Sequence, residues 1–168
     1  MTTNIEPVHF AITESLQYAL KVTGNEDYLK GPAYSGSAGL DLYCARVFEI
    51  EQGQTRLIDT GIRTMIPPDH VGILKERSSI GKRYDPELSL QLRAGVIDSD
   101  YRGVIYVKVS LPFGSYHHSV LYKPGDRLPY QLVVHKCTNN YIAIPEEIFE
   151  ERADFLTERG SRGFGSSN

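Results

Sequence analysis

An aspartate at the end of an apolar stretch is the residue best suited to activating water in this chain. Asp98 directly follows Gly95, Val96 and Ile97, and the chain then turns over residues 99–103 into another β-rich stretch. A carboxylate at the inner end of a buried strand loses part of its hydration and is held rigidly, as a general base must be. The alternative interpretation is a plain hairpin with a polar turn.

A second segment combines guanidinium groups, hydroxyls and a glycine. Residues 75–83 read Lys-Glu-Arg-Ser-Ser-Ile-Gly-Lys-Arg, so Arg77, Ser78 and Ser79 are adjacent. An arginine fork beside two hydroxyls presents several hydrogen-bond donors to phosphate oxygens. Taken alone, however, the segment is better interpreted as a solvated charged turn, because such short patterns are frequent by chance.

The third segment lies near the C-terminus, where residues 157–167 read Thr-Glu-Arg-Gly-Ser-Arg-Gly-Phe-Gly-Ser-Ser. Glycine lets backbone amides approach an anion, so these amides, the serine hydroxyls and Arg159 together predict a phosphate cradle. Phe164 has little to pack against among glycines and is therefore predicted to stack on a planar ligand. A mobile tail without a binding role is the equally simple alternative.

Short β-strands are expected to position these residues. Between about residues 38 and 145, apolar and β-branched residues alternate or cluster in runs bounded by Gly, Pro, Asp and Asn. The clearest alternation places Ile105, Val107, Val109 and Leu111 on one face, which is predicted to be core. Many short strands at this spacing indicate a sandwich or a barrel.

Helical signals are weak by comparison. Residues 88–94 suit either a strand or a short helix, and residues 145–155 carry a proline and acids placed for a helix start. Neither stretch is expected to carry the fold. We therefore predict one β-domain over residues 1–145, followed by a C-terminal arm over residues 146–168.

Length and composition limit the partners and the location. A chain of 168 residues suits one domain. Its net charge of −3 leaves no basic field to hold a nucleic-acid polymer. Because there is neither a membrane-length apolar run nor a signal-peptide pattern, we expect a soluble intracellular protein of the cytoplasm or nucleus, not secreted. Cys44 and Cys137 lack zinc-ligand spacing and are predicted to be buried free thiols.

Taken in order, five segments resemble the motifs of the trimeric dUTPase family. They are residues 38–42 (AGLDL), 75–83, 94–103, 125–127 (GDR) and 157–167. Their joint occurrence is far more specific than any single match. The resemblance implies an all-β, distorted jelly-roll (β-clip) fold and a homotrimer with shared active sites. It also implies that the C-terminal arm closes over the active site of a neighbouring subunit.

The activity implied by the resemblance is hydrolysis of dUTP to dUMP and pyrophosphate, which limits uracil in DNA and supplies dUMP for thymidylate synthesis. Asp98 matches the aspartate that positions the attacking water at the α-phosphorus. Tyr101 matches the tyrosine whose ring lies on the deoxyribose and leaves no room for a 2′-hydroxyl. The backbone implied to read uracil belongs to Gly95, Val96, Ile97 and the strand near Tyr106.

Phosphate and base contacts are implied for two further motifs. Arg77, Ser78 and Ser79 match the phosphate-binding motif. Arg159 matches an arginine on the γ-phosphate, and Phe164 matches the ring stacked on uracil. Additional amide and hydroxyl donors implied in the tail are Gly165, Ser166 and Ser167.

Magnesium is the implied cofactor, held directly by the substrate phosphates. Asp41 and Gln131 match residues that hold water molecules of the magnesium shell. The family usually places this glutamine four residues after the aspartate of Gly-Asp-Arg, whereas here Gln131 follows Asp126 by one residue more. A β-bulge at Pro129 would absorb the extra residue, since proline is tolerated at bulges.

Two alternative functions remain open at the level of sequence. A dCTP deaminase shares the fold and the Arg-Ser-Ser and Gly-x-Ile-Asp patterns, but it requires a glutamate where this chain has Lys108, which cannot replace it. A non-catalytic nucleotide-binding regulatory module would use the same scaffold without turnover. The sequence signature of such a module would be a lost carboxylate or tail, and both are present here.

Overall fold

The computed structural model of the chain describes residues 7–30, 36–78, 89–137, 143–146 and 148. By internal contacts the chain divides into two units, Met1–Thr138 and Asn139–Asn168. All the strands described below belong to the first unit. The boundary predicted at residue 145 stays a prediction, and most of the helix start expected over residues 145–155 lies outside the described residues.

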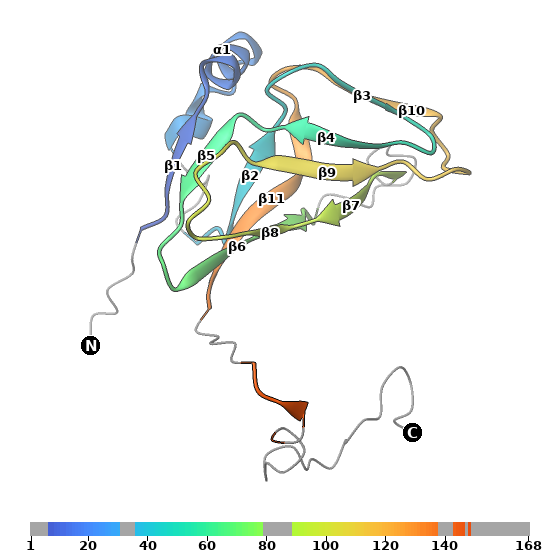
Figure 1. Cartoon of the computed structure of the whole chain (residues 1–168). Coiled ribbons are helices and arrows are strands. Elements are labelled where there is room, and N and C mark those ends of the chain that lie inside the picture. Colours follow the sequence, from blue (N-terminus) through green and yellow to red (C-terminus); the bar gives the residue numbers. More distant parts are fainter. Residues whose placement is uncertain (1–6, 31–35, 79–88, 138–142, 147, 149–168) are drawn as a thin grey trace. The chain divides into compact units, whose positions relative to one another are not determined.

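Antiparallel strands make up most of the first unit (Figure 1). The largest sheet has the order β2 (Gly39–Tyr43), β11 (Arg127–Lys136), β6 (His70–Glu76) and β8 (Val96–Ile97). A second sheet has the order β4 (Thr55–Asp59), β9 (Tyr106–Ser110) and β7 (Gln91–Ala94). Two further pairs join β1 (His9–Ile12) to β5 (Ile62–Met65) and β3 (Phe48–Glu51) to β10 (Ser119–Tyr122). The mostly-β architecture confirms the fold class predicted from the sequence.

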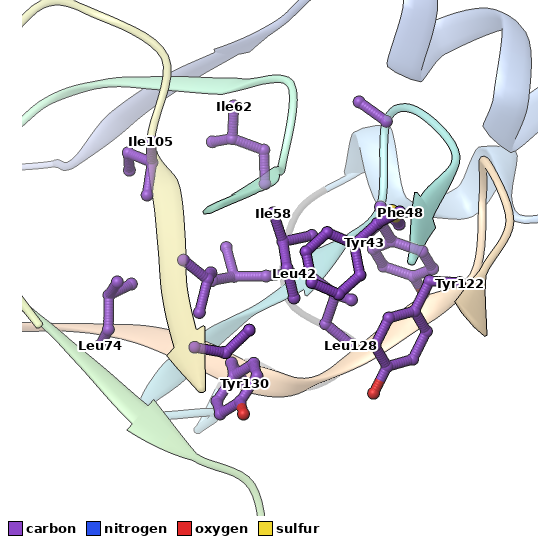
Figure 2. Close-up of a cluster of buried hydrophobic side chains, with 14 of the residues drawn as sticks. Leu42, Tyr43, Phe48, Ile58, Ile62, Leu74, Ile105, Tyr122, Leu128 and Tyr130 are labelled. Carbon is purple, nitrogen blue, oxygen red and sulfur yellow. The ribbon is translucent and has the colours of Figure 1, made fainter. Parts of the chain in front are cut away.

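One cluster of buried side chains joins these sheets (Figure 2). It includes Ile58 of β4 together with Leu42 of β2, Leu74 of β6 and Tyr130 of β11. The face predicted to be core is confirmed, because the side chains that alternate along and beside β9 are all completely buried. They are Ile105, Val107, Val109 and Leu111.

The stretch that suited either strand or helix is a strand. Residues 91–94 form β7, which pairs with β9 through Leu92 opposite Val109 and Ala94 opposite Lys108. Neighbouring Leu90 is buried in the common core. Pairing with an existing strand and burial of alternate side chains decide the conformation of so short a segment, because intrinsic propensity is only a weak preference.

The N-terminal region contains a ten-residue helix, α1 (Glu14–Thr23), that the sequence reasoning missed. Its signals are present in the sequence. The Thr13 hydroxyl caps the start by accepting a hydrogen bond from the Leu16 amide (3.4 Å), and the helix ends before Gly24. Leu16, Ala19 and Leu20 are buried at helical spacing on one face.

Two turn glycines let α1 approach the β-domain closely. Gly61 has φ +65°, and a Cβ placed there would lie 2.7 Å from the Leu16 Cβ and 2.7 Å from the Thr13 hydroxyl. Gly125 has φ +88°, and its Cβ would lie 2.6 Å from a methyl of Thr23. Side chains other than glycine are strained at these angles and would push the helix away. The turns at Gly61 and Gly125 therefore leave room for α1 to pack against the β-domain.

After α1 the chain continues into η1 (Glu26–Lys30), a short 3₁₀ helix that leads towards the functional site. Cys44 is a buried free thiol whose pKa is raised to about 11, chiefly by burial. Cys137 is also free but only partly buried, so that half of the prediction was wrong. Within the described part of the chain, no helix has the length and apolar character needed to span a membrane.

Candidate active site

A cavity of about 800 Å³ opens where η1, the segment before β2, the end of β6 and the start of β11 meet. Four residues predicted from the sequence line it, namely Asp41, Arg77, Ser78 and Gln131. The structure therefore brings together residues from three separate motifs. The remaining lining residues are Gly24, Asn25, Asp27, Tyr28, Ser37, Ala38, Gly39, Leu40, Tyr43 and Arg127.

Asp41 is paired with two arginines inside this cavity. One carboxylate oxygen lies 2.7 Å from Nε of Arg77, and the other lies 3.4 Å from a terminal nitrogen of Arg127. Arg77 is positioned by its own backbone amide, which donates to the carbonyl of Pro129 (2.8 Å). With its Nε engaged, Arg77 still has terminal N–H groups for an anion. Arg127 was quoted in a motif but not predicted as a site residue.

Gln131 is the Cα partner of Asp41 across the β2–β11 ladder. The register shifts between Arg127 and Gln131, where four steps along β11 span two steps along β2, so the ladder is irregular where a bulge at Pro129 was expected. The Gln131 amide nitrogen donates to the carbonyl of Glu76 (3.2 Å). The amide oxygen lies against Gly39, in a position that any side chain at 39 would occupy.

Two tyrosines whose rings are in tilted contact form the wall of the cavity on the η1 side. The rings of Tyr28 and Tyr43 have centroids 4.8 Å apart, and Tyr28 also contacts Phe10 at 5.9 Å. Burial raises the pKa of Tyr43, while the guanidinium of Arg127 acts in the opposite direction. Neither tyrosine was predicted from the sequence, because their place in the cavity depends on how α1 and η1 dock.

Asp98 lies in a tight turn after β8 that several hydrogen bonds hold. Its carbonyl accepts from the Tyr101 amide (3.1 Å), and the Tyr101 hydroxyl donates to the carbonyl of Val104 (2.8 Å). Arg102 closes the turn by donating to the carbonyl of Ser99 (2.6 Å). We name residues 98–104 the Asp98 turn. It fixes the backbone at Asp98 and the Tyr101 ring.

The ladder between β7 and β9 ends before the chain reaches the Asp98 turn. The β7–β9 ladder ends with Ala94 opposite Lys108, and the chain then turns to pair with β6, where the Leu74 amide donates to the carbonyl of Gly95 (2.7 Å). Val96 is 70% exposed and Tyr106 is 44% exposed. The prediction that Asp98 ends a buried strand was wrong for a single chain, since β8 lies at the edge of its sheet.

The cavity and the Asp98 turn do not meet within one chain. Ile97 pairs with Gly72 near the start of β6, whereas Arg77 follows the last residue of that strand. Five residues at roughly 3.3 Å each separate Gly72 from Arg77 by about 17 Å, and Asp98 continues in the direction away from Arg77. In one chain, the cavity and the Asp98 turn therefore lie at opposite ends of β6.

Several predicted site residues lie outside the described residues. This applies to one residue of the phosphate-binding motif and to the whole tail set, so their roles stay predictions. They are Ser79, Arg159, Phe164, Gly165, Ser166 and Ser167.

The chain is thus an antiparallel β-domain with an arginine-lined cavity at one end of β6 and an aspartate in a hydrogen-bonded turn near the other end. A family model described as dUTPase matches residues 28–168. The chain therefore belongs to the dUTPase family, as the sequence motifs predicted. The matched region includes the Asp98 turn and the cavity residues from Tyr28 onwards, but not α1.

Relatives of known name agree with this assignment. The deoxyuridine 5'-triphosphate nucleotidohydrolase of Mycobacterium sp. (strain JLS) is 38% identical over 139 residues, which cover 80% of this chain and 84% of that protein. The protein of the same name from Caldanaerobacter subterraneus subsp. tengcongensis is 35% identical over 156 residues, which cover 89% of this chain and 97% of that one.

Solved structures show that the fold is that of known dUTPases. The dUTPase of Staphylococcus bacteriophage 80alpha in complex with dUpNHpp matches with a TM-score of 0.71 and 18% identity, covering 98% of this chain and 99% of that one. A dUTPase from phage phi11 of S. aureus, whose structure concerns the coordination of a structural Mg(II) ion, matches with a TM-score of 0.63 and 17% identity over 86% and 99% of the two chains. The distorted jelly-roll prediction is thereby confirmed.

Proposed function

We propose that this chain hydrolyses dUTP to dUMP and pyrophosphate, with Asp98 as the general base. Membership of the dUTPase family supports the substrate and the reaction. The observation that carries the assignment of the base is the hydrogen-bonded turn that fixes Asp98 at the end of β8. Removing dUTP limits uracil in DNA, and the dUMP that is formed supplies thymidylate synthesis.

The chemical step is an in-line displacement at the α-phosphorus. The carboxylate of Asp98 accepts a proton from water while the water oxygen forms a bond to the α-phosphorus. The bond from this phosphorus to the oxygen bridging the α- and β-phosphates breaks, and pyrophosphate leaves with the electron pair. Arg77 and Ser78 bind phosphate oxygens, which lowers the charge repulsion against the incoming water.

Selection of deoxyuridine rests on the hairpin beside Asp98. The β7–β9 ladder ends before Val96 and Tyr106, and backbone groups beyond its end would pair with the polar edge of a uracil ring. The Tyr101 ring is held by its own hydroxyl and is 42% exposed, so it offers a flat surface to the sugar. A ring in that place leaves no room for a ribose 2′-hydroxyl.

A complete site requires at least two copies of the chain. By the rise of an extended strand, the parts of β6 beside the Asp98 turn and beside the cavity are about 17 Å apart, which is too far for one nucleotide to place its α-phosphate at both. Large apolar side chains on either side of the Asp98 turn are exposed in the single chain, among them Val96 at 70% and Tyr106 at 44%. We infer a homotrimer in which Asp98 of one subunit faces the cavity of another.

Magnesium suits the oxygen donors of the cavity. Asp41 and Gln131 are Cα partners, and the Gln131 amide oxygen is left for the cavity because its nitrogen donates to Glu76. Mg²⁺ prefers oxygen ligands and keeps several waters, so both side chains would hold shell waters while the phosphates bind the ion. When bound, the ion offsets the negative charge of the triphosphate and fixes its orientation.

A substrate panel tests the proposal. The protein is incubated with Mg²⁺ and, separately, each of the four standard dNTPs, dUTP and UTP, while pyrophosphate, nucleoside monophosphate and ammonia are measured. We expect pyrophosphate and dUMP from dUTP alone. Ammonia from dCTP would identify a deaminase instead, and binding of dUTP without any product would identify a regulatory module.

A further inference from the structure

Tyr28, from the N-terminal region, lines the cavity and carries a buried hydroxyl. The residue lies in η1, is 8% exposed, and lines the same cavity as Asp41 and Arg77. Within the described residues, its hydroxyl has no hydrogen-bond partner. Burying a hydroxyl without a partner costs on the order of 1–3 kcal/mol, so such a group requires an explanation.

The ring of Tyr28 has little freedom to carry its hydroxyl elsewhere. It packs between Phe10, at 5.9 Å, and Tyr43, at 4.8 Å. Both contacts use the apolar ring, and a phenylalanine would make them equally well. The contacts therefore account for an aromatic residue at position 28 but not for its hydroxyl.

The hydroxyl is a hydrogen-bond donor at every physiological pH. Burial raises the pKa of Tyr28 far above its usual value, and the nearby Tyr43 and the Asp41 carboxylate add to this rise. Asp41 is near enough to influence the hydroxyl, but its two oxygens already face Arg77 and Arg127. No described residue therefore supplies an acceptor, and an oxygen of a ligand in the cavity would provide one.

We propose that Tyr28 is a further substrate-binding residue whose hydroxyl donates a hydrogen bond to a phosphate oxygen of the nucleotide in this cavity. The inference rests on the proposed function, because it takes the cavity ligand to be a nucleoside triphosphate. It adds to the site a residue from η1, at the very edge of the region that the family model matches. Tyr28 acts on binding and takes no part in proton transfer.

The Tyr28→Phe variant separates this role from a structural one. Binding of the imido analogue dUpNHpp with Mg²⁺ is expected to weaken about tenfold or more, as for a lost hydrogen bond to a charged group. KM for dUTP rises by a similar factor while kcat changes little. Thermal unfolding of the ligand-free protein is unchanged or slightly higher, because the variant removes a buried hydroxyl that had no partner.

Two comparisons make the test specific. Tyr122→Phe is the matched control, since Tyr122 is equally buried at 6% exposure but does not line the cavity; its KM and its affinity for dUpNHpp should equal those of the wild type. Inhibition by deoxyuridine, which has no phosphate, should be the same for Tyr28→Phe and the wild type. A parallel loss of deoxyuridine inhibition would place the contact on the nucleoside and overturn the proposal.

The remaining outcomes distinguish this inference from the proposed function. If the wild type hydrolyses dUTP and Tyr28→Phe binds the analogue equally well, the inference fails while the function stands. A lower unfolding temperature of ligand-free Tyr28→Phe, without weaker binding, would show that the hydroxyl has a structural partner and would also overturn it. If the wild type neither binds dUpNHpp nor hydrolyses dUTP, both proposals fail together.

Discussion

The two ends of β6 differ in how much of their chemistry one chain completes. At the Arg77 end, Asp41 already has two arginine partners and the cavity has walls from four separate segments. At the Gly72 end, the Asp98 turn is rigid, yet it lies beside exposed apolar residues such as Val96. Under the proposed function, one chain completes its binding half, the cavity, by itself and leaves its reacting half, the Asp98 turn, to be covered by another copy.

The largest effect is expected at the reacting half. Replacing Asp98 by Asn removes the proton acceptor but keeps the size and the turn, so hydrolysis should slow by at least ~10²-fold. Pyrophosphate release measures the rate, and binding of dUpNHpp together with the oligomeric state serves as the control; both should be unchanged. Wild-type turnover by this variant would remove Asp98 from the mechanism.

Mixing subunits tests whether the two halves come from different chains. Arg77→Ala damages the cavity and Asp98→Asn damages the turn, so each variant alone should be nearly inactive. After unfolding and refolding together in equal amounts, about a quarter of the sites should combine an intact cavity with an intact turn from another chain. Activity should return towards that fraction of the wild-type value. A mixture no more active than its components would mean that each site uses one chain.

The smallest effect is expected where α1 rests on the β-domain. Gly61→Ala introduces a Cβ at φ +65° that lies 2.7 Å from the Leu16 Cβ, so stability should fall by about 2–4 kcal/mol. Gly114→Ala is the matched control, with φ +80° and no atom within 4 Å of the added Cβ. Its cost should be limited to about 1–2 kcal/mol of backbone strain. Thermal unfolding measures both losses of stability. Equal losses would show that the close packing of α1 against Gly61 contributes little to stability.

The sequence predicted the features that depend only on residues close together in the chain. Alternation identified Ile105 and Val107 as core because each side chain along a strand points to the opposite face from its neighbour. An extra residue between Asp126 and Gln131 predicted the irregularity around Pro129 because a fixed ladder leaves surplus residues no other place.

Features that depend on how distant segments pack together could not be predicted from the sequence. A ten-residue helix is marginal by itself, so α1 is decided by its packing against the turn at Gly61 rather than by propensity. The pairing of Asp41 with Arg127 follows from the register of β2 and β11, which the chain order does not reveal. The buried strand expected before Asp98 was an inference from apolar residues that one chain leaves uncovered.

The seven residues of β6 act as a spacer between the binding and reacting halves. Because side chains alternate along a strand, inserting one residue would turn Arg77 to the opposite face of the sheet, and inserting two would displace it by nearly 7 Å. Loops elsewhere in the chain can change length at little cost. The length of this strand is therefore a fixed dimension of the assembled enzyme.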